Sequence, residues 1–360
     1  MSTSMEEWQT RLNEITRGIG PLDQAAMQAA RARQDVLTKP HGSLGRLEEI
    51  SMQLAGITGN SMPQVREKVV VIMAGDHGVV EEGVSAYPQE VTAQMVLNFL
   101  RGGAAINVLA RQAGARIRTV DMGIAADIPL EPGLQVRKIG HGTRNLAMGP
   151  AMSREQALES VLTGAALIED EIRAGADLIA TGDMGIGNTT AAAAVAAALT
   201  GRSAEELAGR GTGIDDDGLG RKVSAIRRGL DVNRPDARDG LDVLSKVGGF
   251  EIGGLAGVIL GAAAHRRPVV IDGYISTAAA MIAVSLTPAA RDYLIAAHVS
   301  AERGHRTMLE WLHLEPLLNL NMRLGEGTGA ALAMMLVEAA CRVLAEMATF
   351  DEAGVTKKSG

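Results

Sequence analysis

Three glycine-rich turns, each directly before a segment with a helical pattern, have the composition to bind a phosphate group. They are TGDMGIGNTT at 181–190, GRGTGIDDDGLG at 209–220 and LGEGTGA at 324–330. Glycine lets backbone amides approach a ligand closely, and the N-terminus of a helix favours an anion. One turn of this kind can be no more than a tight connection. Three of them together predict a phosphorylated small molecule as the ligand.

Glu326 is the single residue best suited to acid–base chemistry. Gly325 and Gly327 flank it, and the residues around it are small and apolar. A carboxylate in this setting can face a ligand with little steric cover, as a general base must. The alternative is a glutamate in the first turn of a helix that only complements the helix dipole. The two flanking glycines favour the functional interpretation.

An aspartate ends each of four short apolar runs that are typical of buried strands. In an open parallel sheet, ligands bind beyond the carboxyl ends of the strands, so these positions are candidates for a site. Aspartate in a strand-to-helix turn also caps helices, and for any single one of the four both explanations stay open. The four residues are Asp76, Asp121, Asp183 and Asp272.

Short apolar runs alternate with helical patterns over the middle of the chain. This alternation predicts an α/β fold with a mostly parallel sheet. The runs predicted as strands are 69–78, 116–123, 177–187 and 268–274, with 134–140 and 293–300 as weaker candidates. The helical patterns between them cover 88–113, 154–174, 189–199, 219–230 and 278–284.

Both ends of the chain differ from this middle, because they show helical periods without a convincing strand. Helices are predicted at 6–17, 22–37 and 47–57 and, as one long amphipathic helix, at 328–348. We therefore expect three parts. They are a small helical domain from residues 1–58 and 305–350, a large α/β catalytic domain at 59–304 and a flexible tail at 351–360.

The composition excludes nucleic acid as an expected partner. Hydrophobic residues make up 46% of the 360 residues, so a sizeable core can form, but aromatic residues are only 2%. Nucleic-acid-binding proteins usually show basic stripes and aromatic side chains on which bases stack. This chain has neither feature, and its net charge is −7.

The single cysteine and the first residues of the chain indicate in which cellular compartment we expect the protein. One cysteine, Cys341, excludes an intrachain disulfide, and its apolar helical surroundings predict a buried thiol. The first residues are polar and acidic, unlike a signal peptide. The uncharged run at 252–264 is too short to span a bilayer. We expect a soluble, cytoplasmic protein without a membrane span.

Motifs for nucleotide and metal binding are missing or incomplete. The chain has no G-x-x-x-x-G-K-[ST], and no G-x-G-x-x-G opens a first strand–helix unit with an acidic residue about 20 positions later. The three aspartates at 215–217 could hold Mg²⁺, but a turn or capping cluster is favoured. His298, Glu302 and His305 resemble loosely spaced metal ligands, but hydrogen bonding is favoured. We expect neither a metal nor a cofactor.

Nine sequence blocks, in the same order along the chain, match one known family of enzymes. They are KPHGSLGRLE (39–48), AGDHGV (74–79), GVSAYPQEVTAQMVLNFLRGGAAINVLA (83–110), TGDMGIGNTTAAAA (181–194), GRGTGIDDDGL (209–219), FEIGGLAG (250–257), VIDGYISTAAA (270–280), HVSAERGH (298–305) and NMRLGEGTGA (321–330). Together they resemble the nicotinate-nucleotide–dimethylbenzimidazole phosphoribosyltransferases. The match extends over about residues 35–345.

The resemblance implies a reaction, a fold and an assembly. The family transfers the phosphoribosyl group of nicotinate mononucleotide to 5,6-dimethylbenzimidazole. The products are nicotinate and α-ribazole 5′-phosphate, which supplies the lower ligand of cobalamin. The resemblance also implies a Rossmann-like parallel sheet flanked by helices, a small helical domain and a homodimer.

The resemblance carries over to named positions. Glu326 matches the family's proposed general base. Asp183 matches a second catalytic position, at which glutamate is expected, so this chain has the shorter side chain there. The expected phosphate and ribose cradle consists of Gly185, Gly187, Asn188, Thr189, Gly211, Lys222 and Ser300. The expected base pocket consists of Ser85, Tyr87, Pro88, Gln94 and Met95, several of which could instead pack the 88–113 helix against the sheet.

Other functions stay open on the residues alone. A sugar-phosphate or nucleotide isomerase or kinase on a similar sheet would be distinguished by its dependence on ATP. A non-catalytic carrier of a base would bind the base tightly and release no nicotinate. The same transfer to another lower-ligand base, such as adenine, another benzimidazole or a phenolic, is a further alternative.

Overall fold

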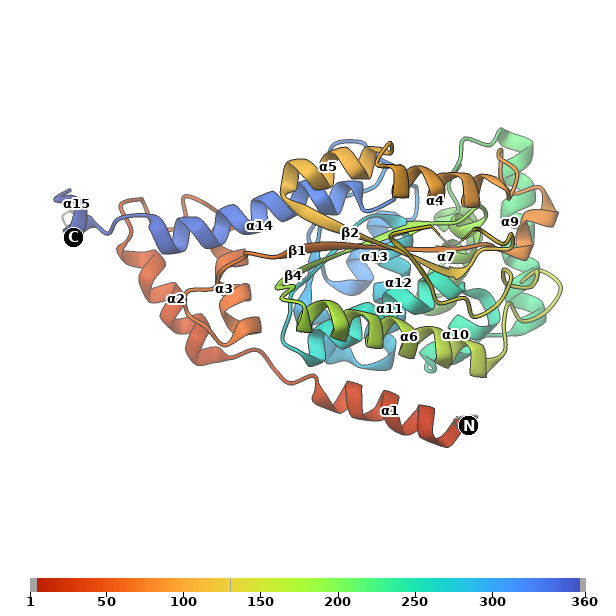
Figure 1. The fold of residues 1–360 in the computed structure, drawn as a ribbon, viewed down its shortest axis with the longest axis horizontal. Coiled ribbons are helices and arrows are strands. Elements are labelled where there is room, and N and C mark those ends of the chain that lie inside the picture. The colour runs from red at the N-terminus through yellow and green to blue at the C-terminus, as the bar shows by residue number, and fades with distance from the viewer. Residues whose placement is uncertain (1–4, 130, 357–360) are drawn as a thin grey trace.

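A six-stranded parallel sheet forms the centre of the protein (Figure 1), in a computed structural model that describes residues 5–129 and 131–356. The strands lie in the order β3-β2-β1-β4-β5-β6, and every neighbouring pair is parallel. The strands are β1 Lys68–Gly75, β2 Ala115–Gly123, β3 Leu134–Val136, β4 Leu178–Met184, β5 Val269–Ile271 and β6 Leu294–Ala296. The predicted α/β fold is confirmed, and each predicted strand is present.

The strand order locates the ligand site. In doubly wound sheets of this order, ligands bind at the carboxyl ends of the strands, where the order reverses. Here the reversal lies between β1 and β4, which are neighbours in the sheet over the whole length of β4.

Helices cover both faces of the sheet. They are α1 Met5–Gly18, α2 Gln24–Val36, α3 Arg46–Thr58, α4 Val91–Arg101, α5 Ala105–Ala113, α6 Arg154–Arg173, α7 Asn188–Thr200, α8 Ala204–Leu207, α9 Asp216–Asn233, α10 Gly240–Val247, α11 Phe250–Ala264, α12 Tyr274–Leu286, α13 His305–Leu312, α14 Thr328–Glu346 and α15 Phe350–Ala353. Short 3₁₀ turns occur at Gly78–Glu82 and Pro288–Tyr293. Figure 1 shows α4, α5 and α14 on one face and α6, α10 and α11 on the other.

The side chains of the central strand show how the two layers are built. Successive side chains of a strand point to opposite faces. Val69, Val71 and Met73 join the apolar cluster of α6, α11 and α12, whereas Val70 and Ile72 join the cluster of α4, α5 and α14. All five are fully buried, so β1 is apolar along its length because both of its faces are covered.

The helix predicted at 88–113 is two helices, so this prediction is wrong. Gly102 ends α4 in the left-handed conformation, with φ +79°, and its N–H donates to carbonyls of the last turn. The chain then restarts at Ala104, whose N–H donates to the Asn107 side chain at 3.0 Å. The two consecutive glycines at 102–103 make this break, because they allow the sharp change of direction.

The glycine-rich helix α11 was not predicted, and its glycines have a packing role. A Cβ at Gly257 would lie 1.9 Å from the Val161 carbonyl oxygen of α6, and one at Gly164 would lie 1.9 Å from the Gly254 carbonyl oxygen. The two backbones therefore touch along these positions. Glycine lowers helix propensity, but here it permits an approach that no larger residue allows.

The helices from the two ends of the chain pack at two separate places on the molecule. α1 lies along α6 and α11, whereas α2 and α3 pack against each other and against α14. Arg33 of α2 donates to the Leu344 carbonyl oxygen at 2.8 Å. The part formed by α2, α3 and the C-terminal half of α14, which we call the arm, projects from the body (Figure 1). The domain boundaries at 58, 304 and 350 stay a prediction.

α14 joins the arm to the sheet. Among the described residues it is the one helix long and apolar enough to cross a membrane by length and composition, and 56% of its apolar window is buried inside the protein. It packs against α3, α5 and β4. Cys341 lies on this helix as a buried free thiol, as predicted.

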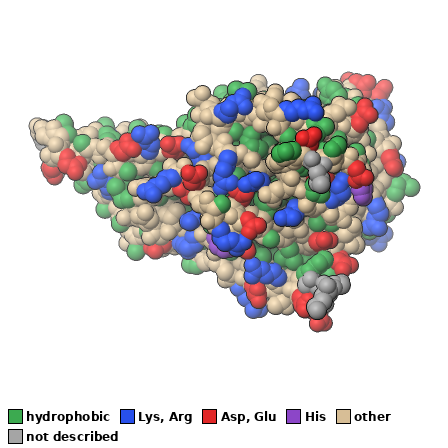
Figure 2. Space-filling model, in the orientation of Figure 1, with side chains coloured by type: hydrophobic (Ala, Val, Ile, Leu, Met, Phe, Trp, Pro, Cys, Tyr) green, Lys and Arg blue, Asp and Glu red, His purple; other side chains and the backbone are tan. Residues whose placement is uncertain are grey.

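Charged side chains of both signs are interspersed over the molecular face shown in Figure 2. Ion pairs join neighbouring elements of the protein, such as that of Arg154 with Asp239 at 2.8 Å. The mixed pattern on this face agrees with the small net charge of −7.

Candidate active site

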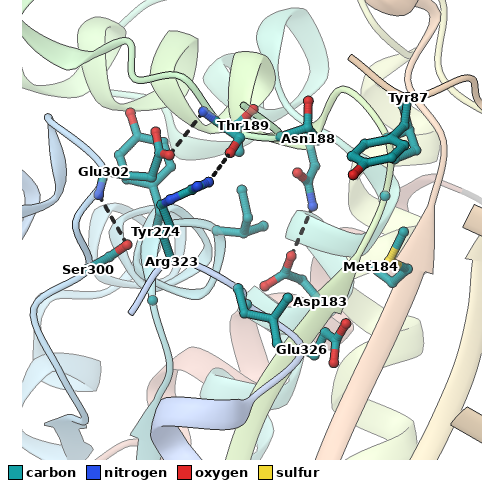
Figure 3. A pocket seen from close by; sticks show the side chains of 18 of the residues that line it. Tyr87, Asp183, Met184, Asn188, Thr189, Tyr274, Ser300, Glu302, Arg323 and Glu326 are labelled. Carbon is teal, nitrogen blue, oxygen red and sulfur yellow. Dashed lines mark hydrogen bonds between the residues drawn. The ribbon is translucent and has the colours of Figure 1, made fainter. Parts of the chain in front are cut away.

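A cavity of about 360 Å³ lies at the carboxyl ends of β4, β5 and β6 (Figure 3). Its wall comes from the start of α7, from the segment after β6 and from the turns that precede α9, α12 and α14. The lining residues are Tyr87, Asp183, Met184, Gly185, Ile186, Asn188, Thr189, Gly211, Thr212, Gly273, Tyr274, Ile275, His298, Ser300, Glu302, Arg323, Leu324, Gly325 and Glu326. The cavity therefore lies at the carboxyl edge of the sheet, where ligands bind in such folds, on the β4 side of the reversal in strand order.

Glu326 lies in a strained turn on the wall of this cavity. Its φ is +63°, between Gly325 at +82° and Gly327 at +90°, so three successive residues are left-handed. A non-glycine residue in this region stores strain that its surroundings must balance, a feature that clusters at functional sites. The side chain is 5% exposed, and its Oε2 has no hydrogen-bond partner among the described residues. Burial raises the pKa of Glu326 to about 7.

Asp183 ends β4 beside Glu326. Its Oδ2 accepts a hydrogen bond from the Asn188 side-chain amide at 2.9 Å, and its Oδ1 has no partner among the described residues. Burial, together with the negative charge of Asp272, raises its pKa well above the usual range. A Cβ on Gly325 would lie 3.3 Å from either Asp183 oxygen, which shows how closely the Glu326 turn packs on this carboxyl.

The other three strand-end aspartates do not line the cavity and instead form hydrogen bonds at the carboxyl edge of the sheet. Asp272 caps α14 by accepting the N–H groups of Gly327 at 3.1 Å and Ala330 at 2.9 Å. Asp121 accepts two N–H groups of its own turn. Asp76 accepts the Thr92 hydroxyl at 2.6 Å, and this hydroxyl in turn accepts the N–H of residue 186 at 3.0 Å. Helix capping therefore explains Asp272, turn geometry explains Asp121, and a hydrogen bond to Thr92 of α4 explains Asp76.

Lys222 is buried directly behind the start of α7. Its ammonium donates to the Thr189 hydroxyl at 2.8 Å and to the Gly209 carbonyl at 3.1 Å. The side chain is 1% exposed, and no ion pair of the described residues includes it. Burial lowers its pKa to about 8. The negative charge of Glu302 opposes this shift but forms no ion pair with the ammonium, and a buried cation without an ion pair suits an anionic ligand group.

The predicted phosphate and ribose residues gather around this lysine. Gly185, Asn188, Thr189, Gly211 and Ser300 line the cavity, and Lys222 lies behind Thr189. Gly187 is the N-cap of α7, with φ +94°, and does not line the cavity. We call Gly185, Asn188, Thr189, Gly211, Lys222 and Ser300 the anion cradle.

His305 fixes the position of Ser300. The Ser300 N–H donates to His305 Nδ1 at 2.7 Å, so His305 Nε2 carries the proton and faces the Thr277 hydroxyl at 2.8 Å. Burial lowers the pKa of His305 to about 3, which keeps the ring neutral. No group of three or more His, Cys, Asp or Glu side chains in the described part of the chain is arranged to hold a metal ion. At 215–217, Asp215 caps α9 by accepting the N–H of residue 218 at 2.8 Å.

Of the five residues predicted for the base pocket, Tyr87 lines the cavity, with 54% of its surface exposed. The Ser85 hydroxyl donates to the Tyr87 carbonyl at 3.0 Å and stabilises this turn. Met95 packs among the apolar side chains beneath α4, and Gln94 is exposed. Ser85, Pro88, Gln94 and Met95 do not line the cavity as it stands, and their role stays a prediction.

Sequence reasoning missed several lining residues. Glu302 was weighed only as a metal ligand, and Arg323 was not singled out, although both lie in the blocks HVSAERGH and NMRLGEGTGA. Met184 and Leu324 add apolar surface near Tyr87 and Glu326. Their position in the blocks was the available signal, but only the fold shows which side of each turn faces the cavity.

The sheet and its site together define a class of protein. A doubly wound parallel sheet carries, at the carboxyl ends of its strands, an anion cradle with a buried lysine and a carboxyl group whose pKa is near 7. This combination is that of an α/β enzyme that binds a phosphorylated substrate and moves a proton at it.

Comparison with known proteins identifies the family. A family model described as phosphoribosyltransferase matches residues 19–355. A nicotinate-nucleotide–dimethylbenzimidazole phosphoribosyltransferase of Roseiflexus sp. (strain RS-1) is 63% identical over 347 residues, which are 96% of this chain and 98% of that protein. The protein of the same name from Desulforudis audaxviator (strain MP104C) is 60% identical over 346 residues, 96% of this chain and 98% of that protein.

A solved structure agrees with these relatives. The crystal structure of CobT from Thermus thermophilus superposes with a TM-score of 0.90 at 50% sequence identity, over 93% of this chain and 100% of that one. The chain belongs to the nicotinate-nucleotide–dimethylbenzimidazole phosphoribosyltransferase family, as its sequence blocks predict.

Proposed function

We propose that this protein transfers the phosphoribosyl group of nicotinate mononucleotide to 5,6-dimethylbenzimidazole. The products are nicotinate and α-ribazole 5′-phosphate, for the lower ligand of cobalamin. One observation carries the proposal for the site. Glu326, a buried carboxyl group with a raised pKa, shares one cavity with an anion cradle that contains an unpaired buried lysine.

The reaction exchanges one carbon–nitrogen bond for another. A ring nitrogen of the incoming base forms a bond to C1′, and the bond from C1′ to the nicotinate nitrogen breaks with its electron pair going to nicotinate. Nicotinate leaves readily because its ring nitrogen is positively charged in the nucleotide. The sugar passes through a cationic, oxocarbenium-like state, which nearby carboxylates stabilise.

Glu326 is the general base in this proposal. When one nitrogen of the benzimidazole attacks C1′, the other nitrogen must lose its proton, because positive charge accumulates on the ring. A carboxylate with a pKa of about 7 can accept this proton near neutral pH. Asp183, whose raised pKa favours the protonated form, is a neighbour that can hold a proton beside it.

The anion cradle holds the other end of the nucleotide. The N-terminus of α7 at Asn188 and the ammonium of Lys222 both favour the 5′-phosphate. Holding the phosphate at one end of the cavity aligns C1′ with the incoming nitrogen near Glu326. Figure 3 supports this arrangement, because Asp183 and Glu326 lie together, apart from Ser300 and Glu302. Such positioning can supply several kcal/mol of the barrier reduction.

We further propose that the protein works as a homodimer in the cytoplasm. The support for a dimer is the projecting arm, where Val36 of α2 is 43% exposed although it is apolar. Light scattering after gel filtration checks this proposal, with a particle of twice the chain mass as the expected result.

The test of the reaction is an incubation of pure protein with nicotinate mononucleotide and a panel of bases. We expect nicotinate to appear only when a base is present, without ATP, and fastest with 5,6-dimethylbenzimidazole. Faster transfer to adenine, another benzimidazole or a phenolic would reassign the acceptor. Tight binding of the base without nicotinate release would indicate a carrier, and a requirement for ATP would indicate a kinase.

A further inference from the structure

Two side chains from other parts of the chain hold the backbone N–H and the backbone carbonyl of Gly211, which belong to the two consecutive peptide groups on either side of its Cα. Its N–H donates to Glu302 Oε1 at 3.0 Å, and its carbonyl oxygen accepts from Arg323 Nη1 at 3.0 Å. Figure 3 shows both bonds as dashed lines. The three residues come from the turn before α9, the segment after β6 and the turn before α14.

Gly211 itself lies directly against the cradle lysine. A Cβ built on it would be 2.7 Å from Thr189 Oγ1 and 3.0 Å from Lys222 Nζ, and its φ is +50°. The orientation of the two peptide groups beside Gly211 therefore sets how closely the 209–213 turn approaches the ammonium group. A rotation of either peptide group would change the space in which an anion can reach Lys222.

Glu302 is buried, and its backbone is held by hydrogen bonds. It is 7% exposed, and its own N–H donates to the Ser300 hydroxyl at 3.3 Å. The Ser300 N–H is held in turn by His305 at 2.7 Å. The backbone that carries this carboxylate is thus fixed in the segment after β6, while Oε2 of the carboxylate has no hydrogen-bond partner among the described residues. Arg323, by contrast, is exposed and reaches Gly211 from the turn that leads to Glu326.

We propose that Glu302 and Arg323 are positioning residues that clamp the backbone of Gly211 and preform the anion cradle around Lys222. Both side chains line the cavity, and in this proposal their effect comes from the hydrogen bonds with Gly211 and not from a contact with the phosphate. Without the clamp, the 209–213 turn would have to become ordered when the nucleotide binds, and that entropy cost would weaken binding. The inference rests on the proposed function, because it names the nucleotide phosphate as the group that the cradle receives.

The experiment measures the binding of nicotinate mononucleotide, in the absence of any base, by titration calorimetry. Glu302→Ala removes the acceptor for the Gly211 N–H and should raise the dissociation constant about ten- to hundredfold, as expected for a lost hydrogen bond to a charged group. Glu302→Gln keeps an acceptor oxygen and should stay within about threefold of the wild type. Dimethylbenzimidazole affinity should change less than about twofold in both variants.

Arg323→Ala provides a second variant that folds, because this side chain is exposed. It should weaken nucleotide binding about fivefold, and the double variant with Glu302→Ala should be no more than about twofold worse than Glu302→Ala alone, since both side chains fix the backbone of the same residue, Gly211. Asp216→Ala is the matched control. Asp216 pairs with Arg210 on the same turn without touching the Gly211 backbone, so its loss should leave nucleotide affinity unchanged.

Three outcomes would overturn the clamp. The first is an equal nucleotide affinity in all variants and the wild type. The second is a loss of nucleotide affinity in Glu302→Gln as large as that in Glu302→Ala. The third is a double variant in which the two losses of affinity multiply, because this would indicate that Glu302 and Arg323 contact the ligand independently. The calorimetry needs no turnover. If the wild type binds the nucleotide and Glu302→Ala does not, the clamp stands even where no nicotinate is released, and only the proposed reaction fails.

Discussion

Burial acts in opposite directions on the acidic and basic groups around the cavity. It raises the pKa of Glu326 to about 7 and lowers that of Lys222 to about 8. In each case the charged form is the one that low polarity disfavours. Both groups therefore change their protonation state close to neutral pH, and the substrate's own charges can shift them further.

Replacement of Glu326 by glutamine should abolish most of the turnover. Gln keeps the shape of the side chain but cannot accept the proton of the benzimidazole, so turnover should fall by at least about 10²-fold while base affinity stays nearly intact. In the wild type, kcat/KM should rise with pH through the Glu326 pKa of about 7, because the base must be ionised. Steady-state assays of nicotinate release across pH check both statements.

Asp183→Asn is the paired control for this assignment. Asp183 lies beside Glu326 but has its Oδ2 bonded to Asn188. If Glu326→Gln keeps near-normal turnover while Asp183→Asn loses it, then Asp183 is the base.

The same Glu326→Gln change should stabilise the protein at alkaline pH. The pKa of Glu326 is about 7 in the folded chain and 4.5 ordinarily, so the folded state holds the proton longer and stability falls as pH rises between these values. The Glu326→Gln variant has no carboxyl group to ionise, so its stability does not fall with rising pH for this reason. Its free energy of unfolding should match the wild type near about pH 4 and exceed it by about 2 to 3 kcal/mol at about pH 8. Urea denaturation at the two pH values measures the difference, and a pH-independent difference would contradict the raised pKa.

Lys222→Ala should separate nucleotide binding from base binding. The ammonium is the buried cation of the cradle, so its loss should weaken nicotinate mononucleotide binding at least about tenfold and leave the free base nearly unaffected. In the wild type, nucleotide affinity should decline as pH rises above about 8, because burial lowers the lysine pKa to this value. Calorimetry with each ligand tests this. Equal losses for both ligands, with a lower melting temperature, would make Lys222 structural.

At the scale of elements, the contact between α6 and α11 depends on residues without side chains. Gly257 of α11 lies against the Val161 carbonyl, and Gly254 lies against Gly164 of α6. Both helices cover the same face of the sheet, behind the strands that carry the site. The distance between these helices is therefore set by backbone contact.

A methyl group at this contact should destabilise the fold. The Cβ of Gly257→Ala would lie 1.9 Å from a backbone oxygen that cannot move aside, so the free energy of unfolding should fall by about 1 to 3 kcal/mol. Gly220→Ala is the matched control. Gly220 lies exposed on α9 with nothing within 4 Å of its Cβ position, and alanine there should stabilise by up to about 1 kcal/mol. Chemical denaturation of both variants measures the two effects. If Gly257→Ala were stabilising like Gly220→Ala, helix propensity and not close packing would determine the effect of alanine at Gly257.

The elements were largely predictable from the sequence, because their signals are local. Each strand is a short apolar run, and the glycine-rich turns mark where α7 and α14 begin. α11 was missed because its glycines lower helix propensity and serve a contact with α6 that appears only in three dimensions. The clamp of Glu302 and Arg323 on Gly211 was equally out of reach, since these residues are about 90 and 110 positions from the glycine they hold. Glu326 could be found from its two flanking glycines and from the block that contains it, whereas Lys222 lies just after a block and was assigned through the family resemblance.

For the whole molecule, the chemistry of the leaving group predicts turnover without a metal ion. The leaving group is nicotinate, so no diphosphate needs a divalent cation. Turnover should survive an excess of EDTA, measured as nicotinate release before and after chelation. Loss of activity that Mg²⁺ restores would contradict this and direct attention to the aspartates at 215–217, of which Asp215 caps α9.

α14 connects the Glu326 turn to the arm, and its length and helical period fix the distance and the relative rotation of the two. It has 19 residues, so about 28 Å of straight helix separates the Glu326 turn from the carbonyls that Arg33 holds. Inserting one residue between 328 and 346 would turn everything beyond it by about 100° and shift it by about 1.5 Å. Arg33 would then face the wrong side of the helix while Glu326 stayed in place. Within this family, changes in chain length are therefore expected in the loops and not in this helix.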